Sequence, residues 1–410
     1  MTSVCVIGGG TAGAEAAREA SEGGARVTIF EGCDEQDPPW RFWPELVRES
    51  PGAFHRPSTS SLVSDPPDAT LILSEAKSAG KGFVQAKDGS RMRFDVIIAA
   101  TGCGFEPTLI PGYRKPGVHI LDRASKYAEL GRLRGSYAET VVQGEGARAL
   151  QVADKLCGEG RKVRILARRW EDGEPSPAVR EVLEHAADER GISISKGVLG
   201  KAVGSVSLEA ILVEGSVIPC DGLVVLPRRI PRVIPIEART GRKGGILVDR
   251  ALMTSSPSIY AAGGCAELSI GPLSSFTLED RPAKSGRIAG ANSVGQRLAI
   301  DPFTSTTIAV FGRRWTRMRA GVMPARTCGS PTSIVSQRTG SGSACTIVFE
   351  RPSGRVLGIE VIEEMSSAQV ETLLISSDPV SLRSLAYGFS SDISLVSDTA
   401  RLGLSAWSNS

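Results

Sequence analysis

The first thirty residues alternate between apolar runs and a helix-forming stretch. Residues 4–7 are apolar, residues 14–22 are good helix formers, and residues 26–30 are β-prone. Strand, turn, helix and strand in this order predict a βαβ unit over residues 3–31. Because a βαβ connection joins parallel strands, we expect a parallel sheet.

The same order of elements returns in the middle of the chain. A second βαβ unit is predicted over residues 140–166, with its helix at residues 148–157. The elements expected after it are a helix at residues 176–190 and strands near residues 193–198, 208–213 and 223–226. Two units of this type predict two separate parallel sheets along the chain.

The segment between the two units has a different pattern. Residues 38–59 are rich in Pro, Ser and aromatic side chains, which predicts a loop with one short helix at residues 44–49. A buried strand is expected at residues 96–100. Short antiparallel strands should lead into it at residues 70–74, 82–87 and 92–94.

The last third of the chain divides in two. Strands at residues 245–248 and 258–262 and a helix at residues 283–296 form the first part. The part after residue 302 predicts strands at residues 306–311, 318–322, 345–350 and 356–361, then a helix at residues 367–376. This change of pattern predicts a separate α+β domain over residues 303–410.

Composition and charge narrow the class of protein. The chain has 410 residues, 41% hydrophobic and 23% charged, as in a globular protein of two or three domains. Its net charge of +3 favours neither nucleic acid nor acidic lipid as a partner. With no apolar run long enough for a membrane span and no signal segment, we expect a cytoplasmic protein. The eight cysteines have no metal-binding spacing, so no metal is expected.

The first glycine loop has the pattern of a dinucleotide site. Gly8, Gly10 and Gly13 lie between the predicted strand and helix, with Thr11 and Ala12 at the helix start. Such a turn brings backbone N–H groups and a helix N-terminus to a pyrophosphate. Glu31 ends the second strand, where its carboxylate can accept the ribose hydroxyls of an adenosine. The alternative is a turn that only packs helix on strand.

The second loop is less regular. Gly144 and Gly146 keep the turn, and Ala149 takes the third place. Arg168 and Arg169 stand where a carboxylate would read a ribose, which favours the 2′-phosphate of NADPH over NADH. Alternatively, the arginines are a solvated strand end and the pocket is vestigial, since Glu145 adds an acid near the phosphate site.

Four further segments, together with the loops, carry a resemblance to a known superfamily. Residues 96–102 contain Ala-Thr-Gly, residues 258–267 read SIYAAGGCAE, and residues 283–287 and 354–358 begin a helix and a strand. The chain resembles the flavoproteins with two dinucleotide-binding domains, which include pyridine nucleotide-disulphide oxidoreductases, NADH oxidases and ferredoxin reductases. The resemblance covers nearly the whole chain.

The resemblance implies an α/β fold with two Rossmann-like domains and a C-terminal α+β dimerisation domain. It assigns residues 1–110 and 235–302 to FAD, residues 111–234 to NAD(P), and residues 303–410 to a homodimer interface. It also implies further FAD contacts at Thr101, Gly102, Gly263, Gly264, Cys265 and Ala266.

Three departures from the family pattern bear on the chemistry. Gly264 stands where the family has an aspartate that holds a ribityl hydroxyl. The segment that carries the family's flavin-facing cysteine has Trp40, Phe42 and Trp43 instead, and Cys33 comes too early. The histidines are His55, His119 and His185, so the C-terminal domain lacks the family's histidine and glutamate pair.

Several side chains have two interpretations. The three aromatic residues of that segment either stack beside the flavin or fill a gap. Cys103 and Cys265 follow FAD-contacting segments and are either redox-active or, as we favour, buried inert thiols. The basic run of Arg313, Arg314, Arg317 and Arg319 around Trp315 either docks an acidic protein such as a ferredoxin or forms a charged strand face. His55 is expected to be a solvated loop residue.

The sequence therefore predicts an FAD-dependent NAD(P)H oxidoreductase. A hydride should pass from NADPH to flavin N5, and electrons should then go to oxygen, a quinone or an electron-transfer protein, without a redox-active disulfide. No catalytic side chain is assigned. The alternatives are a non-catalytic member of the fold with a structural or regulatory role, and a thiol or disulfide reductase that uses Cys103 or Cys265.

Overall fold

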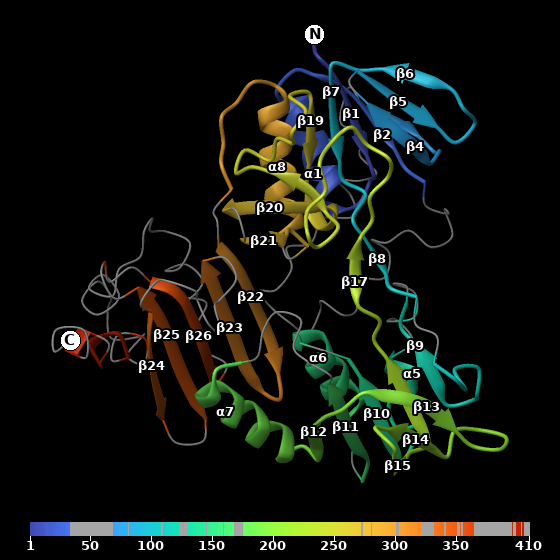
Figure 1. Ribbon diagram of the computed structural model, residues 1–410, viewed down its shortest axis with the longest axis vertical. Coiled ribbons are helices and arrows are strands. Elements are labelled where there is room, and N and C mark those ends of the chain that lie inside the picture. Colours follow the sequence, from blue (N-terminus) through green and yellow to red (C-terminus); the bar gives the residue numbers. More distant parts are fainter. Residues whose placement is uncertain are drawn as a thin grey trace. The chain divides into compact units, whose positions relative to one another are not determined.

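The computed structural model describes most of the two predicted nucleotide-binding regions and the C-terminal strands (Figure 1). The described residues are 1–32, 69–80, 82–107, 110–122, 126, 130–144, 146–158, 160–167, 175–271, 274–279, 281–300, 303–320, 332–339, 342–350, 353, 356–364, 396, 399–402 and 404–405. They fall into two compact units. The first holds those of 1–106 and 229–303, and the second holds those of 107–228 and 304–405.

The first unit is built on a five-stranded parallel sheet in the order β19-β7-β1-β2-β3. Its strands are β1 (Ser3–Ile7), β2 (Arg26–Phe30), β3 (Ala69–Ile72), β7 (Val96–Ala99) and β19 (Ile259–Ala261). The apolar residues of β1 and β7, except the partly buried Val96, are almost fully buried, as expected for a sheet covered on both faces. The order places β1 at the point where the connections change direction, which is the ligand crevice of doubly wound sheets.

Two helices of small residues, α1 (Thr11–Glu22) and α8 (Pro282–Ser293), lie side by side next to this sheet (Figure 1). A Cβ atom at Gly286 would lie 2.2 Å from the carbonyl oxygen of Ala12, and one at Gly290 would lie 2.3 Å from that of Ala16. The two backbones can approach this closely only because both positions lack a side chain. Arg287 of α8 adds an ion pair to Glu15 of α1 at 2.8 Å.

Smaller sheets complete the first unit. One antiparallel sheet consists of β4 (Ala76–Gly80), β5 (Phe83–Ala86) and β6 (Arg91–Arg93). A second consists of β18 (Ile246–Val248), β20 (Ala266–Gly271) and β21 (Ser274–Thr277). β8 (Cys103–Phe105) pairs antiparallel with β17 (Arg229–Pro231), and a short 3-10 turn, η1 (Gly263–Cys265), follows β19.

The second unit repeats the nucleotide-binding pattern. Its parallel sheet has the order β12-β11-β10-β16-β9, with β9 (Val118–Ile120), β10 (Glu139–Gln143), β11 (Lys162–Ala167), β12 (Ile192–Lys196) and β16 (Gly222–Val225). Its helices are α5 (Leu130–Leu133), α6 (Gly146–Leu156) and α7 (Pro177–Asp188). A small antiparallel sheet contains β13 (Leu199–Val203), β14 (Ala210–Val213) and β15 (Ser216–Pro219).

The C-terminal strands of the second unit form a sheet in the order β22-β23-β26-β25-β24. They are β22 (Phe303–Val310), β23 (Arg313–Ala320), β24 (Thr332–Thr339), β25 (Ser343–Glu350) and β26 (Val356–Glu364). Helix α7 packs against β25 and β26. Beside this contact, the buried carboxylate of Glu360 accepts hydrogen bonds from the backbone N–H of Ser176 at 2.8 Å and from Trp315 Nε1 at 3.1 Å.

The fold class and both βαβ units are as predicted, and two local predictions are wrong. The strand expected at residues 70–74 was predicted to be antiparallel, but β3 runs parallel to β2 at the edge of the main sheet. A strand's own sequence does not encode the direction of its partner, because direction depends on the connection. β23 begins at Arg313 and not at residue 318, so the basic run is part of the strand.

The strands β4, β9, β13, β15, β20, β21 and β24 and the pair β8 and β17 were not predicted; each is short, or polar on much of its surface. The helices expected at residues 44–49 and 367–376 lie outside the described residues. No helix among the described residues is long and apolar enough to span a bilayer.

Candidate functional site

The glycines of the first loop have three different structural roles. Gly8 has a φ of +103°, and a Cβ atom there would lie 2.4 Å from the carbonyl oxygen of Ala100 at the end of β7. A Cβ at Gly13 would lie 1.8 Å from the carbonyl oxygen of Gly8, so this position brings α1 against the turn. A Cβ at Gly10 would meet nothing within 4 Å. The loop thus has a tight turn, close helix packing and an open side, which are the features a pyrophosphate site needs.

The start of α1 faces that open side. Gly10 is the N-cap residue and brings no capping side chain, and no acidic residue follows in the first turn. The unpaired N–H groups at a helix start, here at Thr11 and Ala12, are suited to an anion. The geometry therefore fits the phosphates of a dinucleotide.

Glu31 lies beside the same loop. Its Oε2 accepts a hydrogen bond from the backbone N–H of Gly9 at 2.6 Å. Because β1 and β2 are paired in register from Ser3 to Ile7, the end of β2 brings this carboxylate next to the glycine turn. The sequence prediction that these residues lie together is correct, and a ribose is the ligand that this arrangement suits.

The other proposed FAD contacts gather where β7 and β19 end. Thr101 Oγ1 donates a hydrogen bond to the carbonyl oxygen of Arg232, and Gly102 has a φ of +72° with open space at its Cβ position. The N–H of Gly263 donates to Ser285 Oγ at 2.9 Å. Cys265 and Ala266 are fully buried, so their side chains belong to the core.

Gly264 is closely covered by a thiol. A Cβ atom at Gly264 would lie 2.2 Å from Cys103 Sγ. The thiol of Cys103 donates to the carbonyl oxygen of Gly264 at 3.4 Å and to Glu279 Oε2 at 3.5 Å. Cys103 therefore occupies the space next to position 264, and its thiol also contacts the carboxylate of Glu279.

Both cysteines near this site are unsuited to thiolate chemistry. Burial, and then the negative charge of Glu279, raise the pKa of the Cys103 thiol. Burial also raises the pKa of Cys265, whose Sγ donates to the carbonyl oxygens of Ala99 and Ala262. A reactive cysteine needs a lowered pKa, so the structure favours inert thiols here.

The second loop lies at the corresponding point of the second sheet, between β10 and β16. A Cβ at Gly144 would lie 2.7 Å from Leu226 Cδ1, Gly146 has a φ of +68°, and Ala149 is 1% exposed. Ala149 therefore packs where the first loop has Gly13. Arg168, Arg169 and Glu145 lie outside the described residues.

Two charged residues near the loops were not anticipated. Arg148, on the first turn of α6, reaches across to the end of β16 and donates to the carbonyl oxygen of Pro227 at 2.5 Å. Its position in the second loop corresponds to that of Ala12 in the first, and this difference was visible in the sequence. Glu279 has no local signal, because 176 residues separate it from Cys103.

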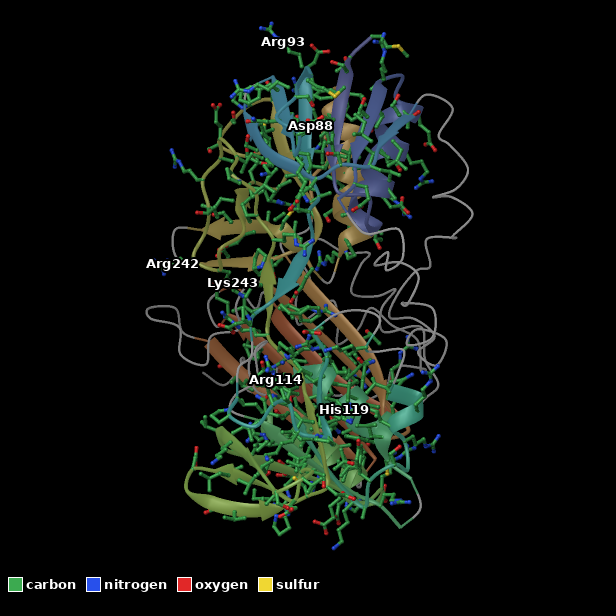
Figure 2. The ribbon with its side chains drawn as sticks, turned by 90° about the vertical axis from the view of Figure 1, so that its right-hand side faces the viewer. Asp88, Arg93, Arg114, His119, Arg242 and Lys243 are labelled. Carbon is green, nitrogen blue, oxygen red and sulfur yellow. The ribbon has the colours of Figure 1, made fainter. Side chains whose placement is uncertain are left out.

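The remaining candidate side chains lie away from the glycine loops or outside the described residues. Cys33, Trp40, Phe42, Trp43 and His55 lie outside the described residues. His119 on β9, labelled in Figure 2, lies 2.7 Å through Nε2 from Tyr137 Oη, and His185 on α7 is half-exposed beside Glu189. Neither histidine belongs to a glycine loop.

Two arginines of the basic run on β23 are buried. Arg313 and Arg317 are only 9% and 7% exposed. Arg317 Nε lies 3.4 Å from the buried Glu360, and its guanidinium stacks over Trp315. Of the two interpretations of the run, docking of an acidic protein by Arg313 and Arg317 is therefore disfavoured, because both side chains are buried in the second unit.

Two parallel sheets, each with a glycine loop at its switch point, define a protein with two dinucleotide-binding folds. The family model for pyridine nucleotide-disulphide oxidoreductases matches residues 2–285, and the chain belongs to this family. The enzyme class expected from the sequence, an FAD-dependent pyridine nucleotide oxidoreductase, is thereby confirmed. Among the described residues no group of three or more potential metal ligands is found.

Individual relatives agree with this assignment. Rubredoxin-NAD(+) reductase of Pseudomonas putida is 28% identical over 282 residues, which are 64% of this chain and 71% of that protein. Rhodocoxin reductase of Rhodococcus erythropolis is 27% identical over 405 residues, 88% of this chain and 86% of the relative. Among solved structures, an NAD-dependent persulfide reductase from A. fulgidus shares the fold, with a TM-score of 0.79 at 20% identity, over 99% of this chain and 84% of that one.

Proposed function

We propose that the first unit binds FAD along the carboxyl edge of its parallel sheet. The N–H groups at the start of α1 and the open side of Gly10 would hold the pyrophosphate, and Glu31 would hold the adenosine ribose. Thr101, Gly102, Gly263, Gly264, Cys265 and Ala266 would line the path of the flavin half. The observation that carries the proposal is the division of roles among Gly8, Gly10 and Gly13.

The second unit would bind the reducing nucleotide at Gly144, Gly146 and Ala149. We propose NADPH, because two guanidiniums, Arg168 and Arg169, replace the expected carboxylate. The names of the Pseudomonas relative and the A. fulgidus enzyme mention NAD and so favour the other nucleotide. Binding measurements on this chain decide between the two.

When bound, FAD supplies the chemistry that takes a hydride from the pyridine nucleotide and passes electrons to an acceptor. The residues of this chain bind and orient the two nucleotides, and no side chain is proposed to carry a proton. With Cys103 and Cys265 held as thiols, the electrons would go directly to oxygen, a quinone or a small electron-transfer protein. Two relatives are named for rubredoxin and rhodocoxin, which supports the last of these.

We further propose that residues 303–410 form the interface of a homodimer. The exposed Ile334 on β24, at one edge of the C-terminal sheet, is suited to such a contact. Sedimentation of the purified protein would give twice the mass of one chain.

The proposed function is tested with the purified protein. It should be yellow, or become yellow when FAD is added, and the colour should bleach when NADPH is added without oxygen. A colourless preparation that takes up no FAD would rule out the flavoenzyme and favour a non-catalytic role for this member of the family.

Nucleotide preference is tested by the double variant Arg168→Ala and Arg169→Ala. If the guanidiniums read the 2′-phosphate, the KM for NADPH should rise by about a hundredfold or more while the KM for NADH changes little, because each charged hydrogen bond contributes ~1.5–3 kcal/mol. The exposed pair Arg91→Ala and Arg93→Ala is the control. An equal change for both nucleotides would contradict the assignment.

A further inference from the structure

We propose that Glu279 supplies the carboxylate that positions the flavin half of FAD, in place of the side chain that Gly264 lacks. This inference rests on the proposed FAD site. It assigns Glu279 as a binding residue for the reaction and Cys103 as the group that closes the space beside Gly264.

Gly264 has no room for a side chain beside the thiol of Cys103. A Cβ atom there would lie 2.2 Å from Cys103 Sγ, 3.3 Å from the Cys103 backbone nitrogen and 3.4 Å from the Gly102 carbonyl carbon. The backbone of Cys103 is held by its pairing with Pro231 in the β8 and β17 ladder. With the thiol in this position a side chain at residue 264 has no room, so a carboxylate for this part of the site would have to come from another segment.

Backbone hydrogen bonds and the buried Leu278 hold the segment that carries Glu279. Glu279 lies between β21 and α8, in a segment that is tied to the region after η1 by the hydrogen bond from Leu278 N–H to the carbonyl oxygen of Ala266 at 3.1 Å. Leu278 is 1% exposed and anchors the segment in the core. The N–H of Arg281 donates to the Leu278 carbonyl oxygen, so hydrogen-bonded residues flank Glu279.

The carboxylate of Glu279 contacts the thiol that lies beside Gly264. Its Oε2 lies 3.5 Å from Cys103 Sγ, and the same sulfur lies 3.4 Å from the carbonyl oxygen of Gly264. Glu279 and Cys103 are both partly exposed, so neither side chain is enclosed in the core. The open Cβ positions of Gly102 and Gly104 leave free space on the adjacent segment.

The flavin half of FAD carries groups that a carboxylate can bind. An FAD whose pyrophosphate lies on the first loop must extend its other half past the ends of β7 and β19, since ligands of doubly wound sheets lie outside the carboxyl ends of the strands. That half carries hydroxyl and N–H donors, for which an ionised carboxylate is a strong acceptor. Glu279 is a carboxylate that lies in direct contact with the segment at residues 102–104, through Cys103.

The inference is tested by the FAD affinity of Glu279→Gln, measured as quenching of free flavin fluorescence. The variant keeps the shape of the side chain and loses the charged acceptor, so the Kd for FAD should rise about tenfold to a hundredfold. Glu22→Gln, on the exposed last turn of α1, is the matched control and should leave the Kd unchanged. The melting temperature of both proteins without FAD shows whether folding is affected.

A second set of variants tests the role of Cys103. Gly264→Asp alone should weaken FAD binding, because its Cβ meets the thiol. In the Glu279→Gln background, Cys103→Ala together with Gly264→Asp should recover at least part of the lost affinity, because a carboxylate then stands in the space that the sulfur left.

The outcomes separate the inference from the function on which it rests. If the unmodified protein binds no FAD, the proposed function fails. If it binds FAD and Glu279→Gln binds equally well, the inference alone is overturned. A Glu279→Gln variant that loses affinity but gains nothing from the carboxylate at position 264 contradicts the replacement of one carboxylate by the other.

Discussion

At the scale of single residues, different glycines of the first loop serve ligand binding and protein packing. Gly10 borders open space, whereas Gly13 touches the carbonyl oxygen of Gly8. The two glycines are alike in the sequence motif, yet a methyl group meets protein at one position and would meet a ligand at the other.

Alanine substitutions should distinguish the packing role of Gly13 from the ligand-binding role proposed for Gly10. Gly13→Ala should lower the free energy of unfolding by about 1–3 kcal/mol or more, since overpacking against the backbone cannot relax easily. Gly10→Ala should leave thermal stability nearly unchanged and raise the Kd for FAD by about tenfold or more, equal to ~1.4 kcal/mol. Urea unfolding and flavin titration measure the two effects. The same loss of stability in both variants would contradict the assignment.

Cys103 allows a prediction about pH. Burial and the charge of Glu279 raise its pKa in the folded protein above that of an unfolded thiol, about 8.5. Its contribution to stability is therefore complete below about pH 8.5. Above that pH it should fall by up to ~1.4 kcal/mol per pH unit, because the unfolded chain ionises first.

The measurement is urea unfolding of the protein and of Cys103→Ala between pH 7 and pH 10. The variant should lose stability less steeply as the pH rises, and iodoacetamide should react with Cys103 only slowly at pH 8. Rapid alkylation at pH 8 would instead indicate a reactive thiol and revive the thiol reductase hypothesis.

At the scale of elements, the contact between α1 and α8 holds the nucleotide loop in place. Gly286 and Gly290 face the backbones of Ala12 and Ala16, and Ala12 belongs to the glycine loop itself. Any change that separates the helices would therefore also move the start of α1, where the pyrophosphate is proposed to bind.

Gly286→Ala should reduce both stability and FAD affinity, since its Cβ would lie 2.2 Å from the carbonyl oxygen of Ala12. The expected loss of unfolding free energy is about 1–3 kcal/mol. Lys284→Ala, at an exposed position of the same helix, is the control for helix propensity. A stable Gly286→Ala variant with normal FAD binding would show that the helices can separate without moving the loop.

At the scale of the whole molecule, a buried polar cluster ties the C-terminal sheet to the second nucleotide-binding fold. Glu360 is 1% exposed and is bonded by Ser176, Trp315 and Arg317. This contact explains why the described residues of 107–228 and 304–405 form one unit. The division of the chain into three domains and the homodimer remain predictions.

Glu360→Gln should destabilise the second unit by about 3–5 kcal/mol, because it leaves the buried charge of Arg317 uncompensated. Glu184→Gln, exposed on α7, is the control. Unfolding followed by tryptophan fluorescence reports the change, since Trp315 lies in the cluster. A loss below ~1 kcal/mol would mean that the cluster is not required for the unit.

The sequence by itself determined the two βαβ units, the glycine turn between the first strand and helix, and the position of Glu31 at the end of the second strand. These features are local: periodicity, glycine turns and strand ends act over a few residues, so they can be recognised without the fold. Most strands of the C-terminal sheet followed the same logic, except β24, which was not predicted, and the start of β23, which a charged run from Arg313 to Arg319 obscured.

Only the tertiary structure decided which distant groups meet. The parallel direction of β3, the pairing of β8 with β17, the thiol of Cys103 over Gly264 and the nearby carboxylate of Glu279 all join segments far apart in the chain. Such contacts depend on how the connections return to the sheet edge, and a local pattern holds no information about that. The part of the proposed FAD site where the chain departs from its family is therefore the part that the fold, and not the motif, defines.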